Sequence, residues 1–364
     1  MTHKYNIAGI QQVGIGVENL YEAWKYYIEL FQMDVRILED NKVAALMLPY
    51  TGGKPQRRHA AIAVNMQGGG GFEVWQYSER KPQPLGFELQ MGDLGVLVCK
   101  LRSRDVTSAF EAFSRNPKAK LVGGLNINID GSQTFYLQDP YGNLFQVVQD
   151  DYLFKDEGRL TGGVAGVTIG VTDIDRAMTV YHDILGYDTI LADETGTFPD
   201  YAALPGGTGG FRRRLLGHSQ PRKGSFSQLF GPSRIELVQA LDRTPRKIYE
   251  GRYWGDPGFI QVCFDIRNME ALGKQCALLG HPFTVDTTQQ YREGSSFDMG
   301  DAAGQFAYIE DPDGTLIEFV ETHKVPLVKK LGLSINLQKR DPEKPLPRWM
   351  LKALSLMRVK SESL

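Results

Sequence analysis

The pattern of apolar and polar residues predicts a strand–helix–three-strand unit at the start of the chain. Val13, Ile15 and Val17 alternate with small or polar residues, which is typical of a strand with one buried face. Apolar residues then recur at helical spacing over residues 20–31, and Asn19 just before them is a suitable N-cap. Three further strands are predicted near residues 35–38, 43–48 (or 60–64) and 72–77.

The same order of elements begins again at three later points, Gly95, Val164 and Phe259, and Asp173 can cap the helix of the third unit. Self-similarity of this kind indicates a structure built from repeated units. The third unit contains a long glycine-rich stretch, residues 199–224, with three consecutive arginines at 212–214. We predict a surface loop or hairpin there, in which the arginines form a solvated face.

Two of the units end in the same turn and strand. Residues 309–320 read Ile-Glu-Asp-Pro-Asp-Gly-Thr-Leu-Ile-Glu-Phe-Val, and residues 137–148 read Leu-Gln-Asp-Pro-Tyr-Gly-Asn-Leu-Phe-Gln-Val-Val. The Asp-Pro-X-Gly segment predicts a tight turn. Alternation along the following strand places Glu318 in an otherwise apolar strand, with Gln146 at the same position of the earlier copy. Such a carboxylate is either solvated on an edge strand or directed into a cavity as a ligand or base.

The 364 residues, 42% hydrophobic and 23% charged, have an ordinary globular composition and suffice for two domains. In each unit the single helix covers one face of a small sheet, so the other face stays open. Two units side by side would form a concave surface, where ligands commonly bind. We predict a first domain at 1–150 (units 9–80 and 92–150), a linker at 151–163, a second domain at 164–323 (units 164–242 and 255–323) and a basic tail at 324–364.

Composition narrows the range of functions. The net charge of −2 gives no reason to expect nucleic-acid binding, and no run approaches the ~18 apolar residues of a membrane-spanning helix. Residues 1–9 contain no apolar signal core. The three cysteines, Cys99, Cys263 and Cys276, lack metal-site spacing and fit a reducing compartment better than a disulfide framework. We therefore predict a cytoplasmic protein.

The tail has its own pattern, with ten Lys or Arg residues and three Asp or Glu residues. Apolar residues at helical spacing over residues 347–360, among them Trp349 and Leu354, predict a basic amphipathic helix. We expect this helix to pack on its own domain or on a second subunit of a homodimer. Contact with an anionic membrane is the less favoured alternative.

Four such units, two of them ending in Asp-Pro-X-Gly-X-Leu-X-(Glu/Gln), resemble the vicinal oxygen chelate superfamily of glyoxalases, bleomycin-resistance proteins and extradiol dioxygenases. The resemblance covers about residues 9–322 and includes Gly-Ile-Gln-Gln-Val-Gly-Ile-Gly-Val at 9–17 and Val-Ala-Gly-Val-Thr-Ile-Gly-Val at 164–171. It implies an α+β fold of four βαβββ modules, paired into two glyoxalase-like domains, followed by the C-terminal helical tail. It also implies that each domain can hold one divalent ion, with ligands from the first and last strands of two modules.

The resemblance assigns ligand positions residue by residue. They are Gln12, Glu73, Val96 and Gln146 in the first domain, with Val96 placed to within about two residues, and Gly166, Glu236, Gln261 and Glu318 in the second. None of these positions holds a histidine.

In the second domain, the resemblance makes Glu236, Gln261 and Glu318 the metal ligands. Oxygen donors suit Mg²⁺ or Mn²⁺ better than Zn²⁺, Ni²⁺ or iron. Glu236 and Glu318 are also the predicted catalytic residues, because two adjacent carboxylates share a proton and can act as acid and base. The chain would then be a metal-assisted, glyoxalase-like lyase or isomerase that transfers a proton beside the carbonyl group of a small oxygenated substrate.

The first domain offers one carboxylate and two amides, which is a poor cation site. Gln12, Glu73 and Gln146 are predicted to bind substrate, with Trp75 as a stacking surface. A second hypothesis is therefore a non-catalytic small-molecule-binding protein that has lost the metal site. An extradiol-type dioxygenase is less favoured, because Gly166 and Gln261 stand where that class needs histidines for iron.

Overall fold

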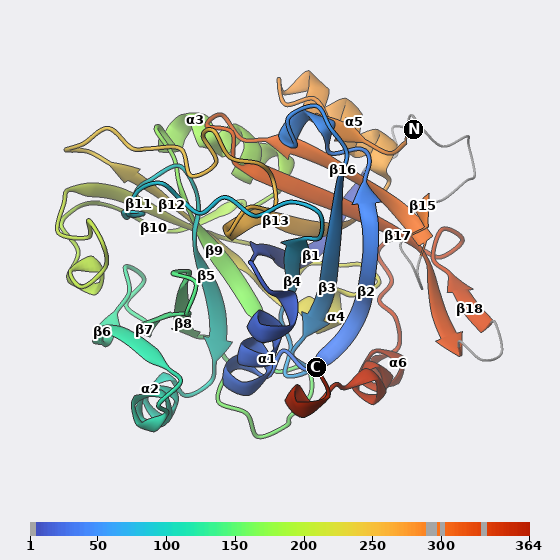
Figure 1. Ribbon diagram of the computed structural model, residues 1–364, viewed down its shortest axis with the longest axis horizontal. Coiled ribbons are helices and arrows are strands. Elements are labelled where there is room, and N and C mark those ends of the chain that lie inside the picture. Colours follow the sequence, from blue (N-terminus) through green and yellow to red (C-terminus); the bar gives the residue numbers. More distant parts are fainter. Residues whose placement is uncertain (1–4, 289–296, 299–302, 329–332) are drawn as a thin grey trace.

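The computed structural model describes residues 5–288, 297–298, 303–328 and 333–364 of the chain. It contains the four predicted βαβββ modules and a short helical tail, so the predicted fold class is confirmed (Figure 1). The first module comprises β1 (Asn6–Gly16), α1 (Leu20–Phe31), β2 (Val35–Ala44), β3 (Gln56–Val64) and β4 (Gly71–Tyr77). The second comprises β5 (Gly95–Ser103), α2 (Val106–Arg115), β6 (Lys120–Ile127), β7 (Gln133–Gln138) and β8 (Leu144–Gln149).

The second half of the chain repeats this order. The third module comprises β9 (Val164–Gly170), α3 (Ile174–Met178), β10 (Thr189–Gly196), β11 (Phe211–Gly217), α4 (Ser227–Phe230) and β12 (Arg234–Ala240). The fourth comprises β13 (Gly258–Arg267), α5 (Met269–Leu278), β14 (Val285–Asp286), β15 (Phe297–Asp298), β16 (Ala303–Glu310) and β17 (Leu316–Val328). After it come β18 (Leu333–Asn336) and α6 (Arg348–Ala353). The predicted caps are correct: the side chains of Asn19 and Asp173 accept backbone N–H groups at the starts of α1 and α3.

The modules pair differently from the prediction. The first and fourth form sheet A, in the order β14-β16-β17-β13-β1-β4-β3-β2, with β15 and β18 pairing with β16 and β17. The second and third form sheet B, in the order β10-β11-β12-β9-β5-β8-β7-β6. Each sheet is joined at its centre by first strands, β1 with β13 and β5 with β9, both antiparallel (Figure 1). The predicted boundaries at 1–150 and 164–323 stay a prediction, and both sheets contain strands from either side of the linker.

Neighbouring modules along the chain meet through their helices instead. The Tyr27 hydroxyl of α1 donates to Asp139 in the turn before β8, at 2.7 Å, and Tyr181 donates to Asp311 in the matching turn before β17, at 2.8 Å. A single apolar core on the helix-covered side takes residues from all four modules. Because this core fills the convex side of both sheets, their concave faces can carry polar side chains.

Residues 199–224 correspond to the hairpin alternative of the prediction, because β11 pairs with β10 in an antiparallel hairpin. β11 lies between β10 and β12, and Arg213 in its middle has no exposed surface. Arg212 and Arg214 point to the other face and pair with Asp193 and Asp175. The prediction of a solvated arginine face is therefore wrong for Arg213, because strand alternation turns this one side chain onto the concave face.

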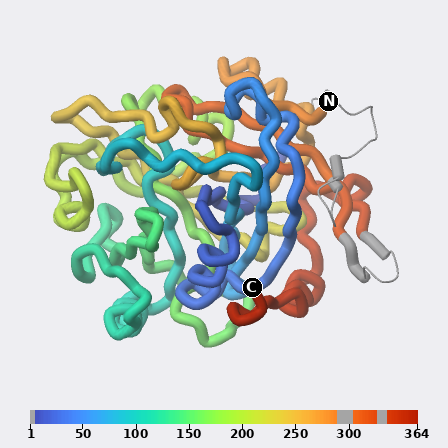
Figure 2. The backbone as a smooth tube through the Cα atoms, viewed as in Figure 1, coloured from blue at the N-terminus to red at the C-terminus, as the bar shows by residue number. Residues whose placement is uncertain are grey.

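The tail packs on its own chain, as predicted. Leu346 and Leu351 are buried in a cluster with Val35 and Val64 of the first module, and the end of the chain lies beside α1 (Figure 2). A second subunit and membrane contact stay predictions. Within the described ranges no helix is long and apolar enough to cross a membrane. All three cysteines are free and buried.

Candidate functional site

The concave face of sheet A brings together four of the predicted site residues. Gln12 of β1, Glu73 of β4, Gln261 of β13 and Glu318 of β17 meet there through hydrogen bonds. Trp75 lies two residues after Glu73, on the same face of β4. The strand phase predicted for Glu318 is therefore correct. We call Gln12, Glu73, Gln261 and Glu318 site A.

Glu236 and Gln146 lie on the concave face of the other sheet, B. The structure therefore does not bring the predicted metal set of Glu236, Gln261 and Glu318 together. The physical reason is the module pairing, which joins the fourth module to the first and leaves the third with the second. Glu73, expected to bind substrate, takes the place beside Glu318 that was expected for Glu236.

Strand register identifies equivalent positions in the two sheets. Four cross-strand pairs define them: Gly14–Glu73 and Cys263–Glu318 in sheet A, and Lys100–Gln146 and Thr168–Glu236 in sheet B. Lys100 thus occupies the position of Gly14. Counting two residues back, Val98 rather than Val96 matches Gln12, and Gly166 matches Gln261.

In site A, the amide of Gln261 bridges the two carboxylates. Its Nε2 donates to Glu73 Oε2 and to Glu318 Oε2, each at 3.1 Å. Its Oε1 accepts from the indole Nε1 of Trp254 at 2.7 Å. Because an indole N–H can only donate, this contact fixes which end of the amide faces the carboxylates.

The two carboxylates of site A hold protons more tightly than ordinary carboxylates. Burial raises the pKa of Glu73 well above its usual range and the Glu318 charge raises it further, against the opposing effects of Arg58 and Gln12. Burial also raises the pKa of Glu318, although hydrogen bonds from Tyr308, Cys263 and Gln261 oppose it. The pair therefore titrates as a unit and shares a proton near neutral pH.

Two buried polar atoms next to this pair have no hydrogen-bond partner among the residues that the structure describes. They are Gln12 Oε1, an acceptor, and Trp75 Nε1, a donor, on residues that are 2% and 0% exposed. An unpaired buried polar group costs about 1–3 kcal/mol, so such groups commonly meet a ligand or water. The Trp75 ring packs against Trp254 and Tyr77, with centroids 4.6 and 4.7 Å apart.

Sheet B has a different site at the equivalent positions. Glu236 accepts from Lys100 Nζ at 2.6 Å, Arg213 Nε at 2.7 Å, the Tyr201 hydroxyl at 2.9 Å and the Thr168 hydroxyl at 3.3 Å. Lys100 also donates to Gln146. We call Lys100, Gln146, Arg213 and Glu236 site B.

The charges of site B are balanced within the protein. Arg213 makes a second, bidentate pair with Asp200 at 2.7 and 2.9 Å, and its guanidinium lies 3.7 Å from the centroid of the Tyr201 ring. Although burial alone would raise it, Arg213 and Lys100 lower the pKa of Glu236 to about 2. Burial lowers the pKa of Lys100 against the opposing effect of Glu236. Since the permanently charged Arg213 also contacts Glu236, we take the ion pair as ionised.

Several residues of these sites were missed by the sequence analysis. Lys100 directly follows the apolar residues Val96–Cys99 of a predicted strand. This position was the only sign in the sequence that its charge could be buried. Arg213 was obscured by its two arginine neighbours. Trp254 lies in a loop, between β12 and β13, where no periodic pattern applies.

The ligand atoms that each site offers determine whether that site could hold a metal cation. Among the described residues, no three His, Cys, Asp or Glu side chains form a metal-binding group. Site A offers two carboxylates and the unpartnered amide oxygen of Gln12, an all-oxygen set that fits a hard divalent ion completed by water. Site B already contains its own ammonium and guanidinium groups, so its donor set does not fit an added cation.

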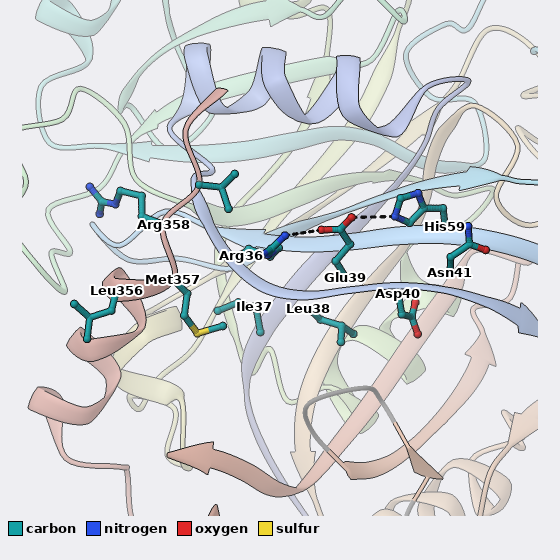
Figure 3. A pocket seen from close by; sticks show the side chains of 11 residues that line it. Arg36, Ile37, Leu38, Glu39, Asp40, Asn41, His59, Leu356, Met357 and Arg358 are labelled. Carbon is teal, nitrogen blue, oxygen red and sulfur yellow. Dashed lines mark hydrogen bonds and ion pairs between the residues drawn. The ribbon is translucent and has the colours of Figure 1, made fainter. Parts of the chain in front are cut away.

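A surface cavity of about 720 Å³ lies elsewhere, between β2 and the tail (Figure 3). It is lined by Arg36, Glu39 and His59 on one side and by Met357 and Arg358 on the other. Glu39 pairs with both Arg36 and His59, at 2.8 and 3.1 Å. These groups satisfy one another, and none of the predicted site residues lines this cavity.

Comparison with known proteins agrees with this fold. Residues 163–319 match the model of the Glyoxalase/Bleomycin resistance protein/Dioxygenase superfamily. The match covers the third and fourth modules, so this part of the chain is similar to the superfamily that the resemblance named. No sequence among the curated proteins matches the chain.

Several solved structures resemble this protein in fold, although their sequence identities to it are low. Glyoxalase I from Zea mays is 17% identical, with 87% of this chain and 92% of that chain covered and a TM-score of 0.52. A putative dioxygenase from Bacillus subtilis is 13% identical, with 87% and 86% covered and the same TM-score of 0.52. A Mn(II)-bound glyoxalase from Novosphingobium aromaticivorans is 11% identical, with 94% and 89% covered and a TM-score of 0.27. At these identities the two structures with a TM-score of 0.52 show a likeness of fold alone, and the chemistry has to be argued from the sites.

Proposed function

We propose that the protein is a glyoxalase-like, metal-assisted lyase or isomerase whose reaction takes place at site A. The observation that carries this proposal is the carboxylate pair with raised pKa values beside the unpartnered oxygen of Gln12. These groups form an anionic, all-oxygen site near Arg58, and among the described residues no cation makes an ion pair with either carboxylate. Mg²⁺ or Mn²⁺ suits such donors better than Zn²⁺, Ni²⁺ or iron.

Glu73, Glu318 and Gln12 are the residues that would hold the cation. A bound divalent ion supplies polarisation of a substrate carbonyl oxygen. Glu318 keeps its predicted role as the proton-transferring base, and Glu73 replaces Glu236 as its partner. A carboxylate with a raised pKa can take a proton from the carbon beside a carbonyl group and return it to a neighbouring atom. The Trp75 indole N–H, unpartnered and fully buried, would donate to a substrate oxygen.

Proton exchange at carbon tests this function directly. The full chain, purified without chelator and supplied with Mg²⁺, is incubated in D₂O with a panel of small hydroxy- and oxo-carbonyl compounds and followed by NMR. We expect deuterium to enter beside the carbonyl group of at least one compound, and Glu318→Gln to slow this by roughly 10²–10⁴-fold. Glu194→Gln, at an exposed position of β10, is the matched control. Exchange that is unaffected by Glu318→Gln, or absent for every compound, contradicts the proposal.

Binding without catalysis is the alternative, favoured by the two unpartnered atoms of Gln12 and Trp75. An acceptor and a donor together suit a neutral polar or aromatic ligand. In a thermal-shift screen without metal, a stabilising ligand whose effect is lost in Gln12→Ala supports this alternative. A response that requires a divalent ion favours the enzyme.

A further inference from the structure

Trp254 determines which end of the Gln261 amide enters site A. The indole N–H of Trp254 needs an acceptor, so it takes the amide oxygen, at 2.7 Å. The amide nitrogen is left facing Glu73 and Glu318, to which it donates two hydrogen bonds of 3.1 Å. Gln261 thus presents donors to the carboxylates, whereas a cation ligand would have to present its oxygen.

Trp254 is itself held in place. It is 6% exposed, its backbone N–H donates to the Tyr50 carbonyl at 2.9 Å, and its own carbonyl accepts from the Tyr77 hydroxyl. Its ring stands edge-on to Trp75, with an interplanar angle of 70°. With the indole fixed on both sides, rotation of the Gln261 amide would break its hydrogen bond to Trp254 and both bonds to the carboxylates.

We propose that Trp254 is a positioning residue that holds Gln261 as a hydrogen-bond donor to the carboxylate pair, and thereby weakens the affinity of site A for a divalent cation. The inference rests on the proposed function, because it concerns the same cation. Gln261 is then a competitor of the cation rather than one of its ligands. Removing the indole N–H leaves the amide free to turn its oxygen toward the site.

The test is the affinity of the full-length chain for Mn²⁺, measured by electron paramagnetic resonance of the free ion. Trp254→Phe keeps an aromatic ring and loses the N–H, so we expect Mn²⁺ to bind about fivefold tighter or more, the effect of about one hydrogen bond. Gln261→Met, which removes both ends of the amide, should bind Mn²⁺ at least as tightly as the original chain. The double variant should match Gln261→Met, because Trp254 acts only through Gln261.

Trp75→Phe is the matched control. Trp75 lies in the same aromatic cluster and is also buried, but its indole N–H has no partner among the described residues, so without substrate this variant reports the change of ring size alone. The gain expected for Trp254→Phe is measured against this control. If Trp254→Phe does not fold, the comparison of Gln261→Met with the original chain decides the question.

Three outcomes overturn the inference, and they differ in whether the proposed function fails with it. If Mn²⁺ binds the original chain but binds Gln261→Met tenfold more weakly, Gln261 is a ligand and only the positioning role fails. The same holds if Trp254→Phe behaves like Trp75→Phe. If neither the original chain nor any variant binds Mn²⁺, both this inference and the proposed metal-assisted function are wrong.

Discussion

Sites A and B occupy equivalent places on two sheets of the same construction, yet their electrostatics are opposite. Site A has two carboxylates, bridged by a neutral amide, whose pKa values are raised. In site B a single carboxylate accepts from an ammonium, a guanidinium and two hydroxyl groups, and its pKa is lowered to about 2. Arg58 lowers the pKa of both site A carboxylates without an ion pair to either among the described residues, whereas site B contains two cations that contact its carboxylate directly.

The position of Gly14 and Lys100 accounts for much of this difference. Both residues pair in register with the last strand of their module, Gly14 with Glu73 and Lys100 with Gln146. Glycine leaves the centre of site A free for the Gln261 amide, whereas lysine fills the centre of site B with a covalently attached cation. Two copies of one fold can therefore keep a ligand site in one case and replace it by an internal ion pair in the other.

The largest effect is expected from removing the internal cation of site B. Lys100→Met leaves Glu236 and Gln146 buried with fewer partners, and breaking a buried ion pair on one side typically costs about 3–5 kcal/mol. We expect a loss of this size in the free energy of unfolding by denaturant. Lys274→Met, at an exposed position of α5, is the control and should change stability by less than about 0.5 kcal/mol. If Lys100→Met is as stable as this control, site B does not depend on its ammonium group.

The two sites should also respond to pH in opposite directions. Glu236, with a folded pKa of about 2 against 4.5 ordinarily, contributes stability that is fully present above about pH 4.5 and is lost as pH falls toward 2. The shift corresponds to about 3 kcal/mol. Denaturant unfolding between pH 2 and pH 6 should show this loss, and a reduced loss in Glu236→Gln. An identical acid profile for that variant would contradict the interpretation.

Glu73 should behave in the reverse way. Its folded pKa is raised above 4.5, so the cation-free protein should lose stability as pH rises from about 4.5 to the raised value and then stay level. We expect Glu73→Gln to reduce this loss by about 1–3 kcal/mol, because it removes one charge of the repelling pair. Unfolding measured in chelator between pH 4.5 and pH 9 is the test. A stability of the original chain that rises over this range would contradict the prediction.

Local sequence patterns were sufficient to predict the modules, and two kinds of long-range information were missing. The alternation that put Glu318 on a concave face and the caps at Asn19 and Asp173 depend on residues close in sequence, so they were predicted correctly. Which modules share a sheet depends on contacts between strands such as β1 and β13, which come from opposite halves of the sequence. The wrong pairing placed Glu236 beside Glu318.

Charges inside the sheets were the second missing element. The sequence shows that Arg213 is one of three arginines and that Lys100 follows an apolar run, but not that both approach Glu236. A buried charge is tolerated only with a partner, and Lys100 finds Glu236 in another module, whereas Arg213 reaches it from the neighbouring strand of the same module. Site A was partly predicted, since Gln12, Glu73, Gln261 and Glu318 were all named, although they were divided between two cavities.

The contrast between the sites predicts one cation per chain. We expect the original chain to bind one equivalent of Mn²⁺, with a stabilisation of about 2.7 kcal/mol at one hundred times its dissociation constant. Glu318→Gln should lose this stabilisation. Thr168→Val, which alters site B without changing its charges, should keep it. Binding of two equivalents, or loss of binding in Thr168→Val, would mean that site B also takes a cation.

The smallest expected effect concerns Gly14 itself. A Cβ atom at this position would lie 3.0–3.2 Å from the amide atoms of Gln261, and the backbone of Gly14 does not require glycine. Gly14→Ala should therefore fold, push the amide away from Glu73 and Glu318, and lower the free energy of unfolding by about 1 kcal/mol. Gly86→Ala, where no atom lies within 4 Å of the new methyl group, is the control. If Gly14→Ala is no less stable than Gly86→Ala, the Gln261 bridge contributes little, and the difference between the two sites rests on Lys100 and Arg213 alone.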